Sequence, residues 1–263
     1  MTRFVALWLS ILLASQSIAA DISIDDFVKF AAYRSVQLSP DGNRLAVAVP
    51  QGDTDLIAIL DISDTAAIKP KARLQLSEGE SVAGLFWAND KRIVFLTARQ
   101  LGSLNQPRST GRIFAMDADG RRMKQIYGIR DAAYVFRYAN IIDRLPERPD
   151  HILVAVYTSD REYPVAEAIN INGGSSRTQT RSPLRRGGLI ADSHGEARFA
   201  FGITDDFEQS FGYRAPGQDK WRIFDNPFPG EMTPVAFDED DKHLIINSRG
   251  KGAMGLFRLN PDS

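Results

Sequence analysis

The sequence contains no cysteine among its 263 residues. Disulfide bonds, thiolate metal sites, a cysteine nucleophile and a lipid-modified N-terminal cysteine are therefore excluded. Histidine is scarce too, with three residues, so a histidine metal site requires residues from distant segments to converge. Charge is nearly balanced, with 32 basic and 33 acidic residues. Without a basic excess, neither nucleic acid nor an anionic membrane is a predicted partner.

The motif that carries the nucleophile of an α/β-hydrolase, G-x-S-x-G, is also missing. Ser175 and Ser176 follow two glycines but precede Arg177, and Ser103 follows Gly102 at the wrong spacing. Strands do not alternate with helices of 10–15 residues, as the sheet of such a domain requires. We therefore predict no catalytic residue, no cofactor-binding residue and no metal ligand in this chain.

Long apolar runs are absent after the first twenty residues, MTRFVALWLSILLASQSIAA. Here Arg3 precedes an apolar run, and small residues follow, which is typical of a secretory signal peptide over residues 1–20. Cleavage fits equally well after Ala19 or after Ala20. The run is shorter than the roughly 18–20 residues of a membrane span. We expect an exported protein, periplasmic or secreted, with no membrane segment after cleavage, and a short lead-in helix over residues 21–33.

A β pattern begins at residue 34. SVQL (35–38) predicts a strand, SPDG (39–42) a turn closed by glycine, and RLAVAV (44–49) a second strand. LIAILDIS and ARLQLS supply two more strands before residue 78. Four strands in about 45 residues is the size of one propeller blade.

The unit then recurs. Turns near Asp41, Asp90, Asp150, Gly195 and Asp241 are about 49, 60, 45 and 46 residues apart. The third arrives late because residues 134–150 are inserted or form extra structure. A sandwich or barrel gives no reason for this longer period. The sequence predicts an all-β fold, a β-propeller of about five four-stranded blades over residues 34–263, approximately 34–77, 82–130, 132–180, 186–228 and 232–263.

These segments carry a family resemblance. The ordered set DFVKFAAYRSVQLSPDGNRLAVAVP, LIAILDI, VAGLFWANDKRIVF and GRIFAMDADG resembles the N-terminal propeller of the prolyl oligopeptidase family of serine peptidases. The similarity is to the secreted bacterial branch, dipeptidyl aminopeptidase or acylaminoacyl peptidase-like. YRAPGQDKW, from Tyr213 to Trp221, also resembles a blade hairpin of that branch. A single SPDG hairpin is weakly specific, since TolB-type propellers contain it too.

The resemblance implies a seven-bladed propeller that covers the site of a separate α/β-hydrolase domain and restricts entry to peptides. Neither a hydrolase segment nor all seven blades is evident here, so we expect an incomplete ring that is inactive alone. The first hypothesis is a substrate-gating propeller that admits peptide substrate through its channel to a separately encoded hydrolase domain. The alternatives are a stand-alone exported propeller that binds a protein or small ligand, and a truncated fragment without function.

Several polar clusters invite a catalytic or metal interpretation. Asp192, Ser193 and His194 contain the residue types of a triad, but neighbours in a turn do not form one. His151 and His243 each follow an Asp-containing turn, and we expect exposed imidazoles there.

Two acidic segments and one glutamate complete the candidates. DADG (117–120) lacks the further ligands of a calcium loop and predicts a β-turn. DEDDK (238–242) predicts a solvated hairpin tip. Glu208 would meet a substrate amine only if it faced the propeller channel.

Overall fold

The computed structural model describes residues 32–64, 66–100, 102, 106–128, 137–228, 230–250 and 252–262. The predicted signal peptide and the predicted lead-in helix up to residue 31 lie outside the described residues, and Ala32 and Tyr33 are not helical. Contacts within the chain separate residues 1–31 from residues 32–263, and the following description concerns the second unit. The described residues contain no helix able to cross a lipid bilayer.

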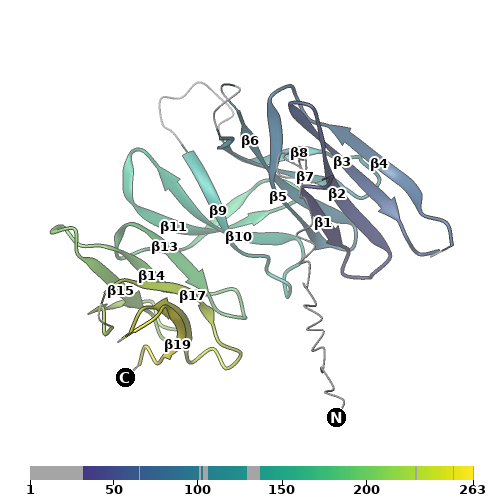
Figure 1. Cartoon of the computed structure of the whole chain (residues 1–263). Helices are drawn as coiled ribbons and strands as arrows, with labels where there is room; N and C mark the ends of the chain where they lie inside the picture. The colour runs from purple at the N-terminus through teal and green to yellow at the C-terminus, as the bar shows by residue number, and fades with distance from the viewer. Residues whose placement is uncertain are drawn as a thin grey trace, which may run out of the picture. The chain divides into compact units, whose positions relative to one another are not determined.

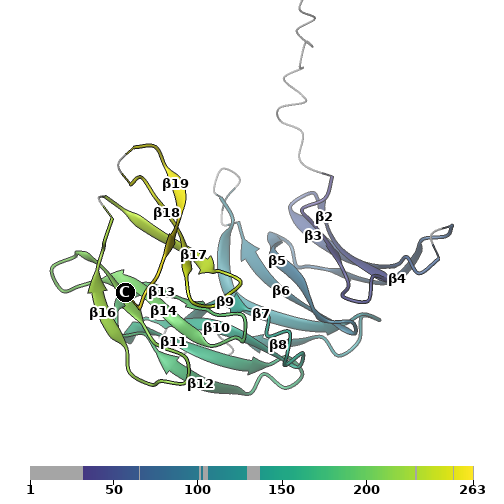
Figure 2. The same cartoon turned by 90° about the horizontal axis from the view of Figure 1, so that it is seen from below.

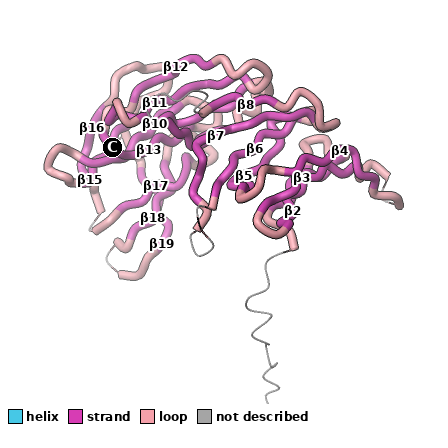
Figure 3. Tube along the Cα trace, turned by 90° about the horizontal axis from the view of Figure 1, so that it is seen from above, coloured by secondary structure: helices cyan, strands magenta, loops and turns pink. Residues whose placement is uncertain are grey.

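The described residues form five antiparallel sheets without any helix (Figures 1 and 3). Sheet 1 contains β1 (Ser35–Leu38), β2 (Arg44–Gln51), β3 (Thr54–Asp61) and β4 (Lys69–Gln75). Sheet 2 contains β5 (Glu80–Asn89), β6 (Arg92–Arg99), β7 (Arg108–Asp117) and β8 (Lys124–Tyr127). Sheet 3 contains β9 (Arg137–Asp143), β10 (His151–Thr158), β11 (Arg161–Asn170) and β12 (Ser176–Arg181).

Sheet 4 contains β13 (Arg185–Ala191), β14 (Ala197–Ile203), β15 (Gln209–Tyr213) and β16 (Arg222–Asp225). Sheet 5 contains β17 (Met232–Phe237), β18 (Leu244–Ser248) and β19 (Gly255–Leu259). In every sheet the strands pair in chain order, as in a meander. The all-β expectation is confirmed, and these sheets are the blades of a β-propeller.

The first hairpin shows how local sequence builds a blade. Gly42 has a φ of 71°, and its N–H donates to the Ser39 carbonyl at 2.9 Å. The Ser39 hydroxyl also donates to the Asp41 carboxylate at 2.6 Å. This turn sets the register in which Leu38 faces Leu45, so that period-2 alternation places one set of side chains on each face.

Four apolar clusters hold the five sheets together, one at each junction between consecutive sheets. The first joins sheets 1 and 2 through residues such as Ile57 and Phe95. The second joins sheets 2 and 3, the third joins sheets 3 and 4, and the fourth joins sheets 4 and 5 around Phe199 and Phe211. Among the described residues no cluster joins sheet 5 to sheet 1. Most of the folding free energy comes from such burial, at about 25 cal/mol per Å² of apolar surface.

The hairpin turns that mark the repeat also contact each other. Arg44 donates to the Asp90 carbonyl at 2.8 Å, and Asn89 donates to the Pro149 carbonyl at 2.6 Å. Between sheets 4 and 5, the Ser193 N–H donates to the Asp241 carboxylate at 2.9 Å. The turns therefore fix neighbouring sheets as well as their own strands.

Residues 134–150, which delay the third unit in the sequence, contain β9. Its register pairs Tyr138 with Tyr157 and Asn140 with Ala155. After β9 the chain continues through the loop of residues 144–150, where Leu145 is buried with a φ of 51°. Because β9 is the first strand of sheet 3, this part of the segment belongs to the repeat.

Candidate functional site

A cavity of about 900 Å³ lies where the first strands of sheets 3, 4 and 5 come together. β13 contacts β9 on one side and β17 on the other (Figure 2). The β10–β11 and β14–β15 turns complete the wall. Its lining residues include Tyr138, Tyr157, Arg186, Phe201, Gln209 and Glu231.

Two stacked tyrosines form one wall of this cavity. Tyr138 of β9 and Tyr157 of β10 are a cross-strand pair whose ring centroids lie 4.7 Å apart, with 6° between the planes. Asn140 is a hydrogen-bond partner of the Tyr157 hydroxyl, and burial raises the pKa of Tyr157, with Tyr138 adding to the shift. The hydroxyl is therefore neutral at pH 7. The pair presents apolar ring surface with hydroxyls at its edge, which suits planar or amide-containing ligands.

The β10–β11 turn brings an acidic group that is already paired. The Glu162 carboxylate lies 3.1 Å from Nε of Arg185, and the same guanidinium lies 2.8 Å from the Asp205 carboxylate. Arg185 Nε also donates to the Tyr163 hydroxyl at 3.3 Å. The Arg185 guanidinium is consequently occupied by these three partners.

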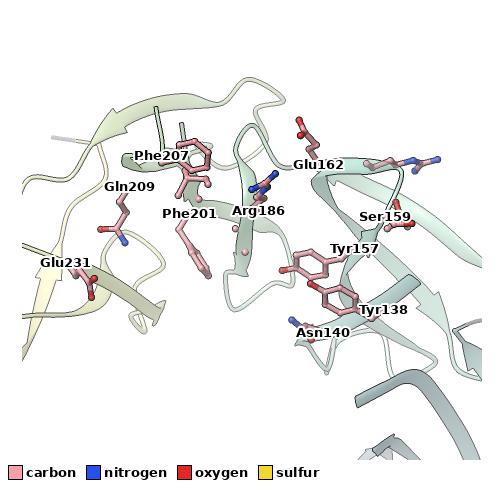
Figure 4. Close-up of a pocket in the computed structure, with 16 residues that line it drawn as sticks. Tyr138, Asn140, Tyr157, Ser159, Glu162, Arg186, Phe201, Phe207, Gln209 and Glu231 are labelled. Atoms are coloured by element: carbon pink, nitrogen blue, oxygen red, sulfur yellow. The ribbon is translucent and has the colours of Figure 1, made fainter. Parts of the chain in front are cut away.

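The opposite end of the cavity contains Gln209 and Glu231 (Figure 4). The Gln209 amide donates to the Met232 carbonyl at 2.8 Å and accepts from the Met232 N–H at 3.2 Å. This pairing ties β15 to the start of β17. The Glu231 carboxylate is exposed and forms no ion pair with any described residue.

The Asp192, Ser193 and His194 segment is a turn, as the sequence predicts. Ser193 hydrogen-bonds the Asp241 carboxylate, while Asp192 accepts the backbone N–H groups of His194 and Glu196. His194 lies 3.5 Å from the Glu147 carboxylate. No hydrogen bond between Ser193 and His194 is present, so these residues do not activate a nucleophile.

The three histidines lie in or next to three separate turns. His151 Nδ1 is 2.7 Å from the Asp150 carboxylate. His243 Nδ1 is 2.8 Å from Asp240, and with Asp238 these atoms lie within 4.8 Å of one another. Arg258 places Nε 2.7 Å from the Asp238 carboxylate and Nη2 3.3 Å from the Asp240 carboxylate. Because a cation of the protein already neutralises this group, it is better described as an ion-pair network than as a metal site.

We expect the Asp240 carboxyl to titrate with a pKa of about 2 instead of 3.8, chiefly because the Lys242 N–H donates to the carboxylate and His243 adds a further bond. Since the folded-state pKa is lowered, the stabilisation that Asp240 gives is complete above pH 3.8 and is lost as the pH falls through about 2. Carboxyl-carbon NMR titration measures this midpoint. A midpoint near 4 would contradict the arrangement, and Asp240→Asn serves as the assignment control.

The remaining candidates do not contribute to the cavity. Residues 117–120 form the predicted β-turn, in which the Gly120 N–H donates to the Asp117 carbonyl, and the Asp117 carboxylate forms ion pairs with Arg92 and Arg122. Ser175 lies in the β11–β12 turn, and Ser103 is outside the described residues. Phe207 and Gln209 line the cavity, whereas Glu208 between them does not.

The tyrosine pair and Arg186 are the functional candidates that sequence reasoning missed. Tyr138 and Asn140 belong to the segment interpreted as an insertion or as extra structure. Arg186 stands next to Arg185, and adjacent basic residues by themselves indicate only a solvated surface. The alternation Tyr138-Ala139-Asn140-Ile141 is the signal from which β9 could have been found.

No protein-family model matches the chain, and no curated protein matches it. Solved structures do match. The oligogalacturonate lyase of Vibrio parahaemolyticus is similar with a TM-score of 0.56 at 10% identity, over 88% of this chain and 66% of the lyase. Prolyl oligopeptidase B of Galerina marginata gives 0.55 at 7% identity, over 92% and 35%.

The acylaminoacyl peptidase of Pyrococcus horikoshii gives a TM-score of 0.52 at 11% identity, over 88% of this chain and 38% of the peptidase. The chain thus spans about two thirds of the lyase and little more than a third of each of these peptidases. At such low identity the similarity shows the propeller fold alone. It joins this chain to peptidase propellers and to a lyase propeller alike.

Proposed function

We propose that this chain is the substrate-binding propeller of a prolyl oligopeptidase-like serine peptidase. In this role it binds short peptides in the cavity between sheets 3, 4 and 5. It presents them to an α/β-hydrolase domain outside these 263 residues, after export directed by the first twenty residues. The chain itself supplies recognition, and the hydrolase supplies the nucleophile.

The composition of the cavity carries this proposal. A peptide offers amides, apolar side chains and a charge at each end. The cavity offers stacked tyrosine rings, the Asn140 and Gln209 amides, a basic group at Arg186 and an acidic group at Glu231. None of the described residues that line the cavity is a histidine, so the geometry favours binding over hydrolysis.

Several structural neighbours are peptidases by their descriptions, and one of them, an acylaminoacyl peptidase, is described in complex with a Z-Gly-Gly-Phe chloromethyl ketone. Its TM-score with this chain is 0.52. These propellers thus occur in proteins that handle peptides, which supports the choice of ligand class.

We expect Tyr157→Ala to weaken peptide binding about tenfold. The substitution removes the stacked wall, and an aromatic contact contributes about 0.5–1.5 kcal/mol beyond its buried area. Isothermal titration calorimetry with the tripeptides Ala-Phe-Ala and Gly-Phe-Gly measures the change.

Tyr33→Ala is the matched control, because Tyr33 is 60% exposed and does not line the cavity. If wild type and Tyr157→Ala bound the peptides with equal affinity, the cavity would not be the peptide-binding site. Absence of binding to any peptide would reject the proposed function itself.

The second candidate is a stand-alone exported propeller that binds a small ligand. The lyase neighbour favours it, because the same fold there belongs to a protein described as acting on oligogalacturonate. Calorimetry with an oligogalacturonate trimer separates the candidates. Binding of the trimer at the cavity, without peptide binding, would support this second function.

A further inference from the structure

Arg186 adopts a backbone conformation that arginine disfavours. Its φ is 49°, in the left-handed region. A side chain with a Cβ meets the following carbonyl there, at a cost of about 1–2 kcal/mol relative to a right-handed conformation. Residues held in such conformations concentrate at binding and catalytic sites. The intrinsic backbone preference of arginine therefore does not explain the left-handed conformation of Arg186.

Arg186 lies in an irregular part of β13 that also contains the two glycines that follow it. Arg185 pairs with Ile203 and Gly188 pairs with Phe201. Between these pairs the chain advances by three residues along β13 but by only two along β14. This is a β-bulge, which turns one side chain out of the regular alternation. A Cβ on Gly187 would lie 1.5 Å from the Phe201 carbonyl oxygen, and one on Gly188 would lie 2.3 Å from the Phe201 ring.

The guanidinium of Arg186, the residue in this bulge, has no partner among the described residues. Arg186 is exposed, lines the cavity, and forms no hydrogen bond or ion pair with any described residue. Its neighbour Arg185 is bound to Glu162, Asp205 and Tyr163. Arg122 offers a second comparison, since its φ is 47° but its Nε lies 2.6 Å from the Asp117 carboxylate. A left-handed arginine thus has a structural role at 122 and no structural partner at 186.

Figure 4 places Arg186 between the Phe201 ring and the tyrosine pair, with Glu231 at the far end of the cavity. A ligand that stacks on the tyrosines is therefore next to a positive charge. Glu162, an acidic residue that also lines the cavity, is already paired with Arg185. An anionic group on the ligand could therefore pair with the Arg186 guanidinium. A carboxylate is well suited, because a guanidinium binds it through two parallel hydrogen bonds.

We propose that Arg186 is the carboxylate-binding residue of the cavity, and that the preferred ligands are short peptides with a free C-terminal carboxylate. This inference rests on the proposed function, which it deepens by naming the ligand class. Glu231 then faces the amino end of such a peptide. The bulge holds the guanidinium ready, so that little side-chain order is lost when the peptide binds.

Calorimetry with four probes tests the inference: Ala-Phe-Ala acid, Ala-Phe-Ala amide, Ala-Glu-Ala amide and inorganic phosphate. For the wild-type chain we expect the acid to bind at least tenfold more tightly than the Ala-Phe-Ala amide, as charged hydrogen bonds of this kind require. Tight binding of Ala-Glu-Ala amide would show that an acidic side chain is the carboxylate recognised, and would overturn the assignment to the C-terminus. Tight phosphate binding would overturn the carboxylate assignment.

Arg186→Gly provides the variant, because glycine accepts the left-handed φ. We expect it to bind acid and amide equally, while its thermal midpoint stays unchanged or rises. Arg186→Lys keeps the charge without the planar fork, and we expect it to retain part of the preference. Arg122→Gly is the matched control: it removes the same charge at the same φ, and we expect it to keep the full preference for the acid.

The outcomes separate the two proposals. If the wild type binds acid and amide equally, peptide binding stands and the role of Arg186 is rejected. If Arg186→Gly keeps the preference for the acid and only loses stability, Arg186 is structural. If no peptide binds to the wild type, the proposed function and this inference both fail.

Discussion

Replacing Arg198 with alanine is expected to lower the free energy of unfolding by about 3–5 kcal/mol. The guanidinium is buried in sheet 4, with Nη1 3.0 Å from the buried Asp192 carboxylate and Nη2 2.7 Å from the Tyr213 hydroxyl. It also donates to the carbonyls of Arg214, at 3.2 Å, and Asp241, at 3.2 Å. Alanine would leave the Asp192 charge buried without its cation and would leave these acceptors unpaired.

Urea unfolding followed by intrinsic fluorescence measures this effect as a lower midpoint with an unchanged slope. Arg44→Ala is the matched control, since Arg44 contacts the next turn in the same way but is half-buried, and we expect it to cost under about 1 kcal/mol. The double variant Arg198→Ala with Asp192→Ala should recover part of the loss, because the buried charge is removed. A loss below 1 kcal/mol for Arg198→Ala would show that the ion pair is open to solvent.

Gly187→Ala is expected to cost about 3 kcal/mol or more, at the upper end of the range for overpacked sites. The added Cβ would lie 1.5 Å from the Phe201 carbonyl oxygen and 2.6 Å from Cα of Gly202. Both are backbone atoms, so no side-chain rotation relieves the clash, and β13 must separate from β14. We also expect the preference for peptide acids to disappear, because the bulge that orients Arg186 would be lost.

Gly173→Ala is the control for this second change. An added Cβ there would be no closer than 3.7 Å to another heavy atom, so we expect its effect to stay within about 0.5 kcal/mol. Thermal unfolding and the peptide titration together measure both variants. If Gly187→Ala were as stable as the wild type and kept its preference for the acid, β13 and β14 would not approach each other closely at Gly187.

Hairpins are the features that the sequence predicts most securely. Pro40, Asp41 and Gly42 specify a turn whose geometry depends on neighbouring residues only, and the structure contains that turn between β1 and β2. β9 was harder to predict, because residues 134–150 combine a short strand with a long loop. Its alternating pattern covers few positions, so turn spacing alone indicates an insertion or extra structure.

Local sequence patterns do not predict the candidate site. Tyr138 and Tyr157 are nineteen positions apart, and their stacking depends on the register between β9 and β10. Arg185 and Arg186 are adjacent and identical in type, yet one is paired with Glu162 and Asp205 while the other has no partner among the described residues. Sequence alone does not distinguish them, because the bulge that separates their directions arises from pairing with β14.

The sequence by itself determined the all-β class, the repeat of hairpins and the absence of a serine hydrolase motif, since each follows from turn chemistry, period-2 alternation or residue order. The tertiary structure decided where the cavity lies and which charges in it remain unpaired. These properties depend on how neighbouring sheets pack and on which strand faces which. Packing brings together residues far apart in the chain, and no local period records their distances.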